Sequence, residues 1–74
     1  MPRLPVLKPR EVISILVSLG FVEIRQRGSH KQFAHPDGRR TTVPVHGSRD
    51  ISPILLRHII KDVRLSREEF LGDS

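Results

Sequence analysis

One short segment, Pro36-Asp37-Gly38, constrains the fold of this chain more than any other, because it lies between two runs of alternating residues. Proline, aspartate and glycine in this order are typical of a tight turn, with glycine where positive φ is tolerated. The runs 30–35 and 39–45 are therefore predicted to be the strands of a β-hairpin. If His35 pairs with Arg39, the next opposed pairs are Phe33 with Thr41, Gln32 with Thr42 and His30 with Pro44.

This register sorts the hairpin onto two faces, because side chains alternate along a strand. The face predicted to meet a hydrophobic core carries Phe33, Thr41, Val43 and Val45. The outward face carries His30, Gln32, Arg40, Thr42 and Pro44. Parity also places His46 outward, roughly 7 Å beyond Pro44 at the rise of a strand. Two histidines are thus predicted to share one exposed side of the sheet.

A third strand is predicted over 21–27, where apolar and polar residues again alternate. Val22 and Ile24 are expected to face the core, and the other side carries Glu23, Arg25 and Arg27. Gly28 and Ser29 follow as a turn, in which glycine permits a positive φ and serine can hydrogen-bond to the nearby backbone. This turn presents His30 at a strand end.

Two helices are predicted to cover one face of the sheet. The first spans about 9–19 and ends before Gly20, and its apolar stripe is Val12, Ile15, Leu16 and Leu19. The second begins at Ser52-Pro53, and its apolar stripe is Leu55, Leu56, Ile59, Ile60 and Val63. Capping-box spacing in Ser66-Arg67-Glu68-Glu69 predicts a short last helical turn that tucks Phe70 and Leu71 inward. The predicted class is α+β, in the order helix, three-stranded antiparallel sheet, helix.

The size of the chain limits what it can enclose. Its 74 residues are expected to form one domain over 1–74, which buries only about 60% of the unfolded surface, so a large enclosed active site is not expected. The absence of cysteine excludes disulfides and thiolate metal sites. Pro2 and Pro5 are expected to keep residues 1–7 extended, with apolar side chains along a core edge from Leu4, Val6 and Leu7.

The sequence also constrains where the protein is located and what it binds. No apolar run approaches the ~18 residues of a membrane span, and the start of the chain is too short and proline-broken for a signal peptide, so a cytoplasmic protein is expected. A formal charge of +5 favours a polyanionic partner, either nucleic acid or an acidic protein. The only aromatic rings besides histidine are three phenylalanines, which are expected to be buried. Contacts to the RNA backbone and 2′-hydroxyls are therefore expected rather than base stacking.

His30 is the leading candidate for chemistry, because histidine is the usual proton carrier near neutral pH. RNA can be cleaved without metal if a base takes the 2′-hydroxyl proton, an acid protonates the leaving oxygen and cations stabilise the phosphorane. His46 is a candidate second proton carrier, with Ser29 as possible support. The candidate phosphate ligands are Arg25, Arg27, Lys31 and Arg40. Each of these residues also has a non-functional interpretation, as an ordinary solvated surface residue or turn residue.

The other two histidines are predicted to be ordinary surface residues. His35 precedes a proline at a turn, and His58 lies on the solvent side of the second helix. A zinc site from His30, His35 and His46 is rejected, because His30 and His35 have opposite parity on their strand and no thiolate is present. Neither a metal nor another cofactor is expected.

A set of short blocks extends over essentially the whole chain: Leu4-Pro5-Val6-Leu7, Leu19-Gly20-Phe21, Arg25-Gln26-Arg27-Gly28-Ser29-His30, His35-Pro36-Asp37-Gly38, Val43-Pro44-Val45-His46-Gly47 and Ser66-Arg67-Glu68-Glu69-Phe70-Leu71. In this order and spacing they resemble the HicA (YcfA-like) toxins of toxin–antitoxin modules. The resemblance implies a fold like a double-stranded-RNA-binding domain and an mRNA interferase that cleaves RNA and halts translation. It places the catalytic histidine at His30. It also implies a HicB-type antitoxin partner, whose acidic surface would suit the charge found here.

The chain departs from that pattern at the starts of both helices. Lys8-Pro9 replaces the Ser/Thr cap and glycine of many relatives, and Ser52-Pro53 replaces a Gly-Thr type entry. Both replacements still begin helices, and the catalytic position is unaltered, so an active toxin is expected. Two other functions stay open on the residues alone: a non-catalytic RNA-binding module, and a domain that only binds an acidic protein.

Overall fold

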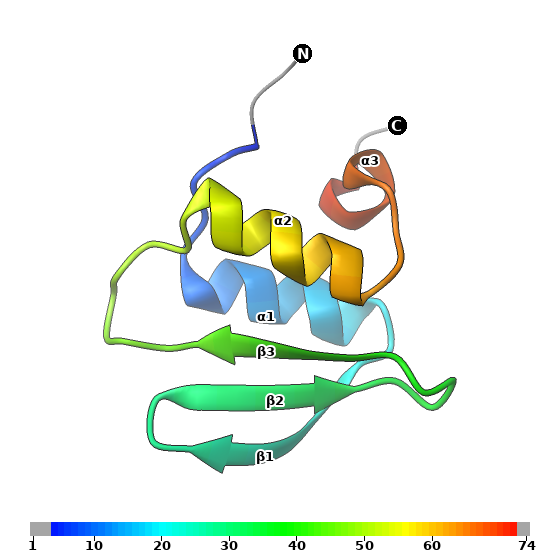
Figure 1. The fold of residues 1–74 in the computed structure, drawn as a ribbon, viewed down its shortest axis with the longest axis horizontal. Coiled ribbons are helices and arrows are strands. Elements are labelled where there is room, and N and C mark those ends of the chain that lie inside the picture. Colours follow the sequence, from blue (N-terminus) through cyan, green and yellow to red (C-terminus); the bar gives the residue numbers. More distant parts are fainter. Residues whose placement is uncertain (1–3, 73–74) are drawn as a thin grey trace.

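A computed structural model describes residues 4–72, and the expectation for Pro2 lies outside this range. The elements follow the predicted order and are α1 (Pro9–Ser18), β1 (Val22–Arg27), β2 (His30–Ala34), β3 (Arg40–Pro44), α2 (Pro53–Asp62) and α3 (Arg67–Leu71). The strands form one antiparallel sheet in the order β1-β2-β3, with the helices on one side of it (Figure 1). The predicted α+β class, similar to a double-stranded-RNA-binding domain, is confirmed.

The helices begin at the residues that the sequence indicates, and α1 ends at Ser18, one residue before the predicted end. At the start of α1 the Glu11 carboxylate accepts a hydrogen bond from the Lys8 backbone N–H at 2.8 Å, and Gly20 follows its end with φ +97°. At the start of α2 the Ser52 hydroxyl accepts from the Leu55 N–H at 3.2 Å. The predicted capping box of α3 is present, since the Ser66 hydroxyl accepts from the Glu69 N–H and the Glu69 carboxylate accepts from the Ser66 N–H.

The hairpin of β2 and β3 has the predicted register. Phe33 pairs with Thr41, Gln32 with Thr42 and His30 with Pro44. The His35 N–H donates to the Arg39 carbonyl at 2.9 Å, and Gly38 closes the turn at φ +101°. Local turn chemistry therefore determines which hairpin side chains share a face, as expected.

The core lies between the helices and the sheet face that carries Phe33, Thr41 and Val43. Buried apolar residues from every layer form it: Leu4, Val12, Leu16, Phe21, Phe33, Val43, Ile51, Leu56, Ile59, Ile60, Val63 and Phe70. All three phenylalanines are buried, as predicted. The first segment lies along the core edge through Leu4 and Leu7, but the prediction for Val6 is wrong, since its side chain is 58% exposed.

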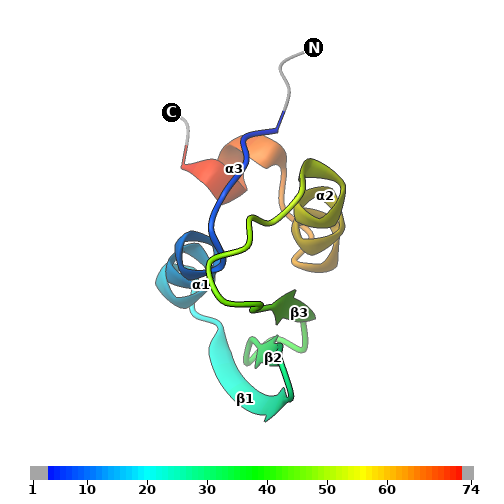
Figure 2. The same ribbon diagram turned by 90° about the vertical axis from the view of Figure 1, so that its left-hand side faces the viewer.

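The prediction that Val22 and Ile24 face the core is also wrong, since they are 60% and 49% exposed. The register of β1 shifts between Glu23 and Arg25, which makes Ile24 the extra residue of a bulge and pairs Val22 with Ala34 on the outward face. The main contacts of α1 and α2 with the sheet are to β3. β1 is the edge strand farthest from α2 (Figure 2), and all of its residues are exposed.

Candidate active site

The turn between β1 and β2 presents His30 at a strand end. Gly28 adopts φ +54°, as expected for this turn, and its carbonyl accepts from the Gln26 side-chain amide at 3.0 Å. His30 begins β2, where it pairs with Arg27 on one side and Pro44 on the other. Its side chain is exposed on the sheet face opposite to the helices. This is the placement that the hairpin register predicts.

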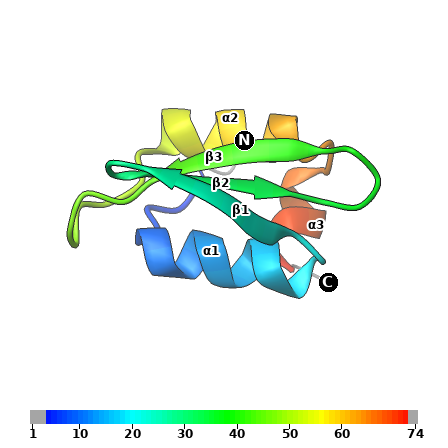
Figure 3. The ribbon, with the colours of Figure 1, turned by 90° about the horizontal axis from the view of Figure 1, so that it is seen from below.

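His46 lies in the loop that follows β3, beside the β1–β2 turn. The β1–β2 turn and the loop after β3 lie at the same end of the sheet (Figure 3). The Val45 N–H donates to the Ser29 carbonyl at 2.6 Å, which joins the two segments. The imidazole rings of His30 and His46 are 6.0 Å apart between centroids, at an interplanar angle of 85°. Ser29 Oγ lies 3.3 Å from His46 Nε2, a contact to a side chain instead of the backbone partner suggested by the sequence.

Three of the predicted phosphate ligands extend over the same outward face. Arg27 pairs directly with His30, and Arg25 pairs with Gln32 one outward position farther along β2. Arg40 pairs with Ala34, four residues from His30, or about 13 Å at the rise of a strand. All three arginine side chains are exposed. The structure therefore brings Arg27 nearest to the histidines and leaves Arg40 at the opposite end of the face.

Lys31 does not share this face. It alternates with His30 along β2, so it points to the helix side, where its ammonium lies 3.5 Å from the Glu23 carboxylate. It lines a surface pocket of about 400 Å³ together with Lys8, Arg10 and Val45. Lys31 thus belongs to a second basic region, on the helix side of the sheet.

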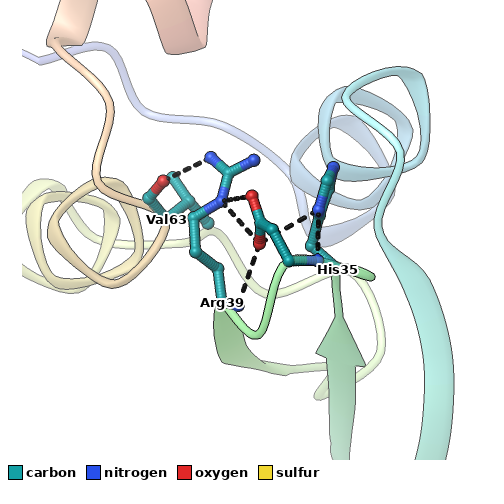
Figure 4. Close-up of polar contacts among 4 residues, drawn as sticks. His35, Arg39 and Val63 are labelled. Atoms are coloured by element: carbon teal, nitrogen blue, oxygen red, sulfur yellow. Dashed lines mark hydrogen bonds and ion pairs between the residues drawn. The ribbon is translucent and has the colours of Figure 1, made fainter.

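His35 is not the plain surface residue that its position before a proline suggests. Its ring packs edge-on against Phe21 at 5.1 Å between centroids, and its Nδ1 accepts from the Asp37 N–H at 3.1 Å. Arg39 pairs with the Asp37 carboxylate and donates from Nη1 to the Val63 carbonyl at 2.7 Å (Figure 4). The sequence contains one indication of this network, the aspartate in the Pro36-Asp37-Gly38 turn. His58 is exposed on α2, as predicted.

Within residues 4–72, no group of three or more histidine or carboxylate side chains is arranged to hold a metal ion. The same range contains no helix long and apolar enough to cross a membrane. The groups gathered around His30 are the imidazole of His46 and the Ser29 hydroxyl that contacts it, with Arg27 paired across the strands.

Comparison with known protein families gives a match. A family model described as the HicA toxin of bacterial toxin–antitoxin matches residues 9–65, which include the whole sheet, α1 and α2. A search of curated proteins finds no match. The matched region contains Ser29, His30 and His46, so the site described above lies inside it. Since the match covers well over half of its length, the chain belongs to the HicA toxin family of bacterial toxin–antitoxin systems.

Proposed function

We propose that this toxin is an mRNA interferase, an endoribonuclease that cleaves RNA without a metal ion and so halts translation in the cytoplasm. The observation that carries the proposal is the position of His30, exposed on the uncovered sheet face and paired directly with Arg27. A proton carrier and a nearby cation are two of the groups that metal-free cleavage of RNA uses. An open face also leaves room for a long RNA strand.

In the proposed reaction the 2′-hydroxyl of RNA is the nucleophile. A base takes its proton as the oxygen forms a bond to phosphorus, and an acid protonates the 5′-oxygen as the bond from phosphorus to that oxygen breaks. The products are a 2′,3′-cyclic phosphate and a 5′-hydroxyl, so no further reactant is required. His30 performs one of the two proton transfers.

The arginines of the outward face are proposed to hold the phosphates. Arg27 is the neighbour of His30 across the strand pair and would stabilise the charge that develops at the reacting phosphate. Arg25 and Arg40 would bind phosphates farther along the strand. Lys31 was a candidate for the same role, but its pairing with Glu23 on the other face favours a weaker, long-range contribution.

The antitoxin implied by the family is proposed to be of the HicB type and to neutralise the toxin by covering His30. A stable interface buries about 800 Å² on each partner. This is a large share of one face of a molecule with 5161 Å² of accessible surface, so a partner seated on the sheet would exclude RNA. An acidic partner surface would complement the formal charge of +5.

The test of this function is the His30→Ala variant. RNA cleavage by the purified protein is expected to fall by at least roughly 10²–10⁴-fold, and growth arrest on expression should disappear, because one proton transfer is lost. The circular dichroism spectrum should not change, since His30 is exposed. His58→Ala is the matched control, because His58 is an exposed histidine on α2. Cleavage retained in His30→Ala would refute the assignment.

The identity of the nucleophile has a separate test. A 2′-deoxy substitution at the cut site should block cleavage, because it removes the attacking hydroxyl, and EDTA should have no effect. Activity that requires an added divalent cation would refute the metal-independent mechanism.

A non-catalytic RNA-binding module is the second candidate, and the exposed arginines of the outward face favour it as much as they favour an enzyme. This module would bind RNA with a steep salt dependence. It would yield no cleavage product even at high protein concentration, which distinguishes it from the interferase.

A further inference from the structure

We propose that His46 is the second proton-transfer residue of this site and that Ser29 is its positioning residue. This inference rests on the proposed RNA cleavage by His30 and adds the group that completes the reaction. The family match names neither residue. The argument depends on how the fold holds the segment that carries His46 beside the β1–β2 turn.

Hydrogen bonds from two directions fix the loop that carries His46. On one side the Val45 N–H donates to the Ser29 carbonyl at 2.6 Å. On the other side the Lys8 ammonium donates to the Ser48 carbonyl at 3.0 Å and pairs with the Asp50 carboxylate at 2.6 Å. These contacts hold the loop between the sheet and the start of α1. His46 is thus placed beside His30 by long-range structure.

The separation of the rings suits a shared phosphodiester. Both side chains are exposed, and their ring centroids lie 6.0 Å apart at 85°. An acid or base must lie about 2.6–3.2 Å from the oxygen with which it exchanges a proton. Two imidazoles at this separation can therefore reach the attacking and the leaving oxygen of one phosphate group. With both proton transfers assigned, neither depends on solvent.

Ser29 restricts the orientation of the His46 ring. Its hydroxyl lies 3.3 Å from His46 Nε2, and the backbone of Ser29 is held by the Val45 N–H. The side chain of Ser29 is half-buried, whereas those of His30 and His46 are exposed. A hydroxyl fixed in this way favours one ring orientation, as a group that orients a catalytic histidine must.

A substrate with an activated leaving group tests the pair. RNA with sulfur in place of the 5′-oxygen at the cut site releases a thiolate, which needs no proton from an acid. On ordinary RNA, both His30→Ala and His46→Ala should lose roughly 10²–10⁴-fold in rate. On the sulfur RNA, one variant should recover to near the wild-type rate and the other should stay slow. The variant that recovers lacks the acid.

The outcomes separate this inference from the proposed function. If His46→Ala cleaves ordinary RNA at the wild-type rate, or if neither variant recovers on the sulfur RNA, the acid–base pair is refuted. If the wild-type protein cleaves neither RNA, the proposed function itself fails. His58→Ala, an exposed histidine on α2, should match the wild type on both substrates.

The role of Ser29 has its own measurement. Ser29→Ala should lower kcat by roughly 2- to 10-fold, the effect of losing one hydrogen bond, and leave KM unchanged. Ser29→Thr should restore kcat, because it keeps the hydroxyl. Equal kcat in Ser29→Ala and wild type, or an equal loss in both variants, would show that the hydroxyl does not position His46.

Discussion

At the scale of single residues, Asp37 shows how one turn side chain connects the hairpin to the rest of the molecule. Its carboxylate accepts from the Arg39 backbone N–H at 3.1 Å and from the Arg39 guanidinium at 2.8 Å. The backbone hydrogen bond, followed by the guanidinium, lowers the pKa of the Asp37 carboxyl from its usual value. Arg39 in turn donates to the carbonyl of Val63, which caps the end of α2.

This lowered pKa predicts the pH dependence of stability. A carboxyl with a lower pKa in the folded state stabilises the fold above its unfolded pKa of about 3.9, and this stabilisation is lost as the pH falls through the folded pKa. Asp37→Asn should therefore lower Tm near neutral pH, and the difference from wild type should shrink below about pH 4. Thermal unfolding of both proteins from about pH 6 to pH 2 measures this difference in Tm. A difference that stays constant over this range would show that the ionised Asp37 carboxylate does not stabilise the fold.

At the scale of elements, a buried threonine joins β3 to α2. Thr41 is buried, and its hydroxyl donates to the Asp62 carboxylate at 3.0 Å. Thr41→Val should lower the free energy of unfolding by about 1–2 kcal/mol, because it removes this bond with little change in shape. Thr42→Val is the matched control on the exposed face and should change it by less than about 0.5 kcal/mol. Equal effects in urea denaturation would contradict the assigned faces.

The connection from α1 to β1 gives a second element-scale prediction. Gly20 and Gly38 have similar positive φ values of +97° and +101°, so alanine at either position costs about 1–2 kcal/mol. A Cβ at Gly20 would also lie 3.0 Å from His35 Nε2, whereas a Cβ at Gly38 would meet nothing within 4 Å. Gly20→Ala should therefore destabilise the protein more than Gly38→Ala. Equal destabilisation in urea would show that His35 moves aside freely.

The features of the fold that the sequence predicts are those that depend on nearby residues. The hairpin register follows from its turn, and the helix boundaries follow from Ser52, Ser66 and Gly20, because these features are local. The faces of β1 could not be predicted from alternation. They depend on the bulge at Ile24 and on the position of the helices over β3, and both are tertiary features.

At the scale of the whole molecule, the charge is divided between the two sides of the sheet. Arg25, Arg27 and Arg40 extend over the open face, and Lys31 lies on the helix side beside Glu23. The sequence predicted the basic character and the approach of His46 to His30, because both follow from composition and strand parity. It could not predict the ring separation or the contact between Ser29 and His46, which depend on the loop anchored by Lys8.

This division predicts the salt dependence of RNA binding. For uncleavable RNA with a 2′-deoxy cut site, Arg27→Gln should reduce the slope of log K against log salt concentration by about 0.7, the value for one phosphate contact to a single strand. Lys31→Gln should reduce it by less, because Lys31 is paired on the other face. A reduction for Lys31→Gln as large as that for Arg27→Gln would contradict the proposed RNA path.

We propose that this member of the HicA toxin family cleaves RNA through His30. The most direct measurement is the mapping of fragment ends after a defined RNA is incubated with the purified wild-type protein and with His30→Ala. The wild type should yield fragments with 2′,3′-cyclic phosphate and 5′-hydroxyl ends, and the variant should yield none. Identical fragments from both proteins, or fragments that end in a 3′-hydroxyl and a 5′-phosphate, would contradict this proposal.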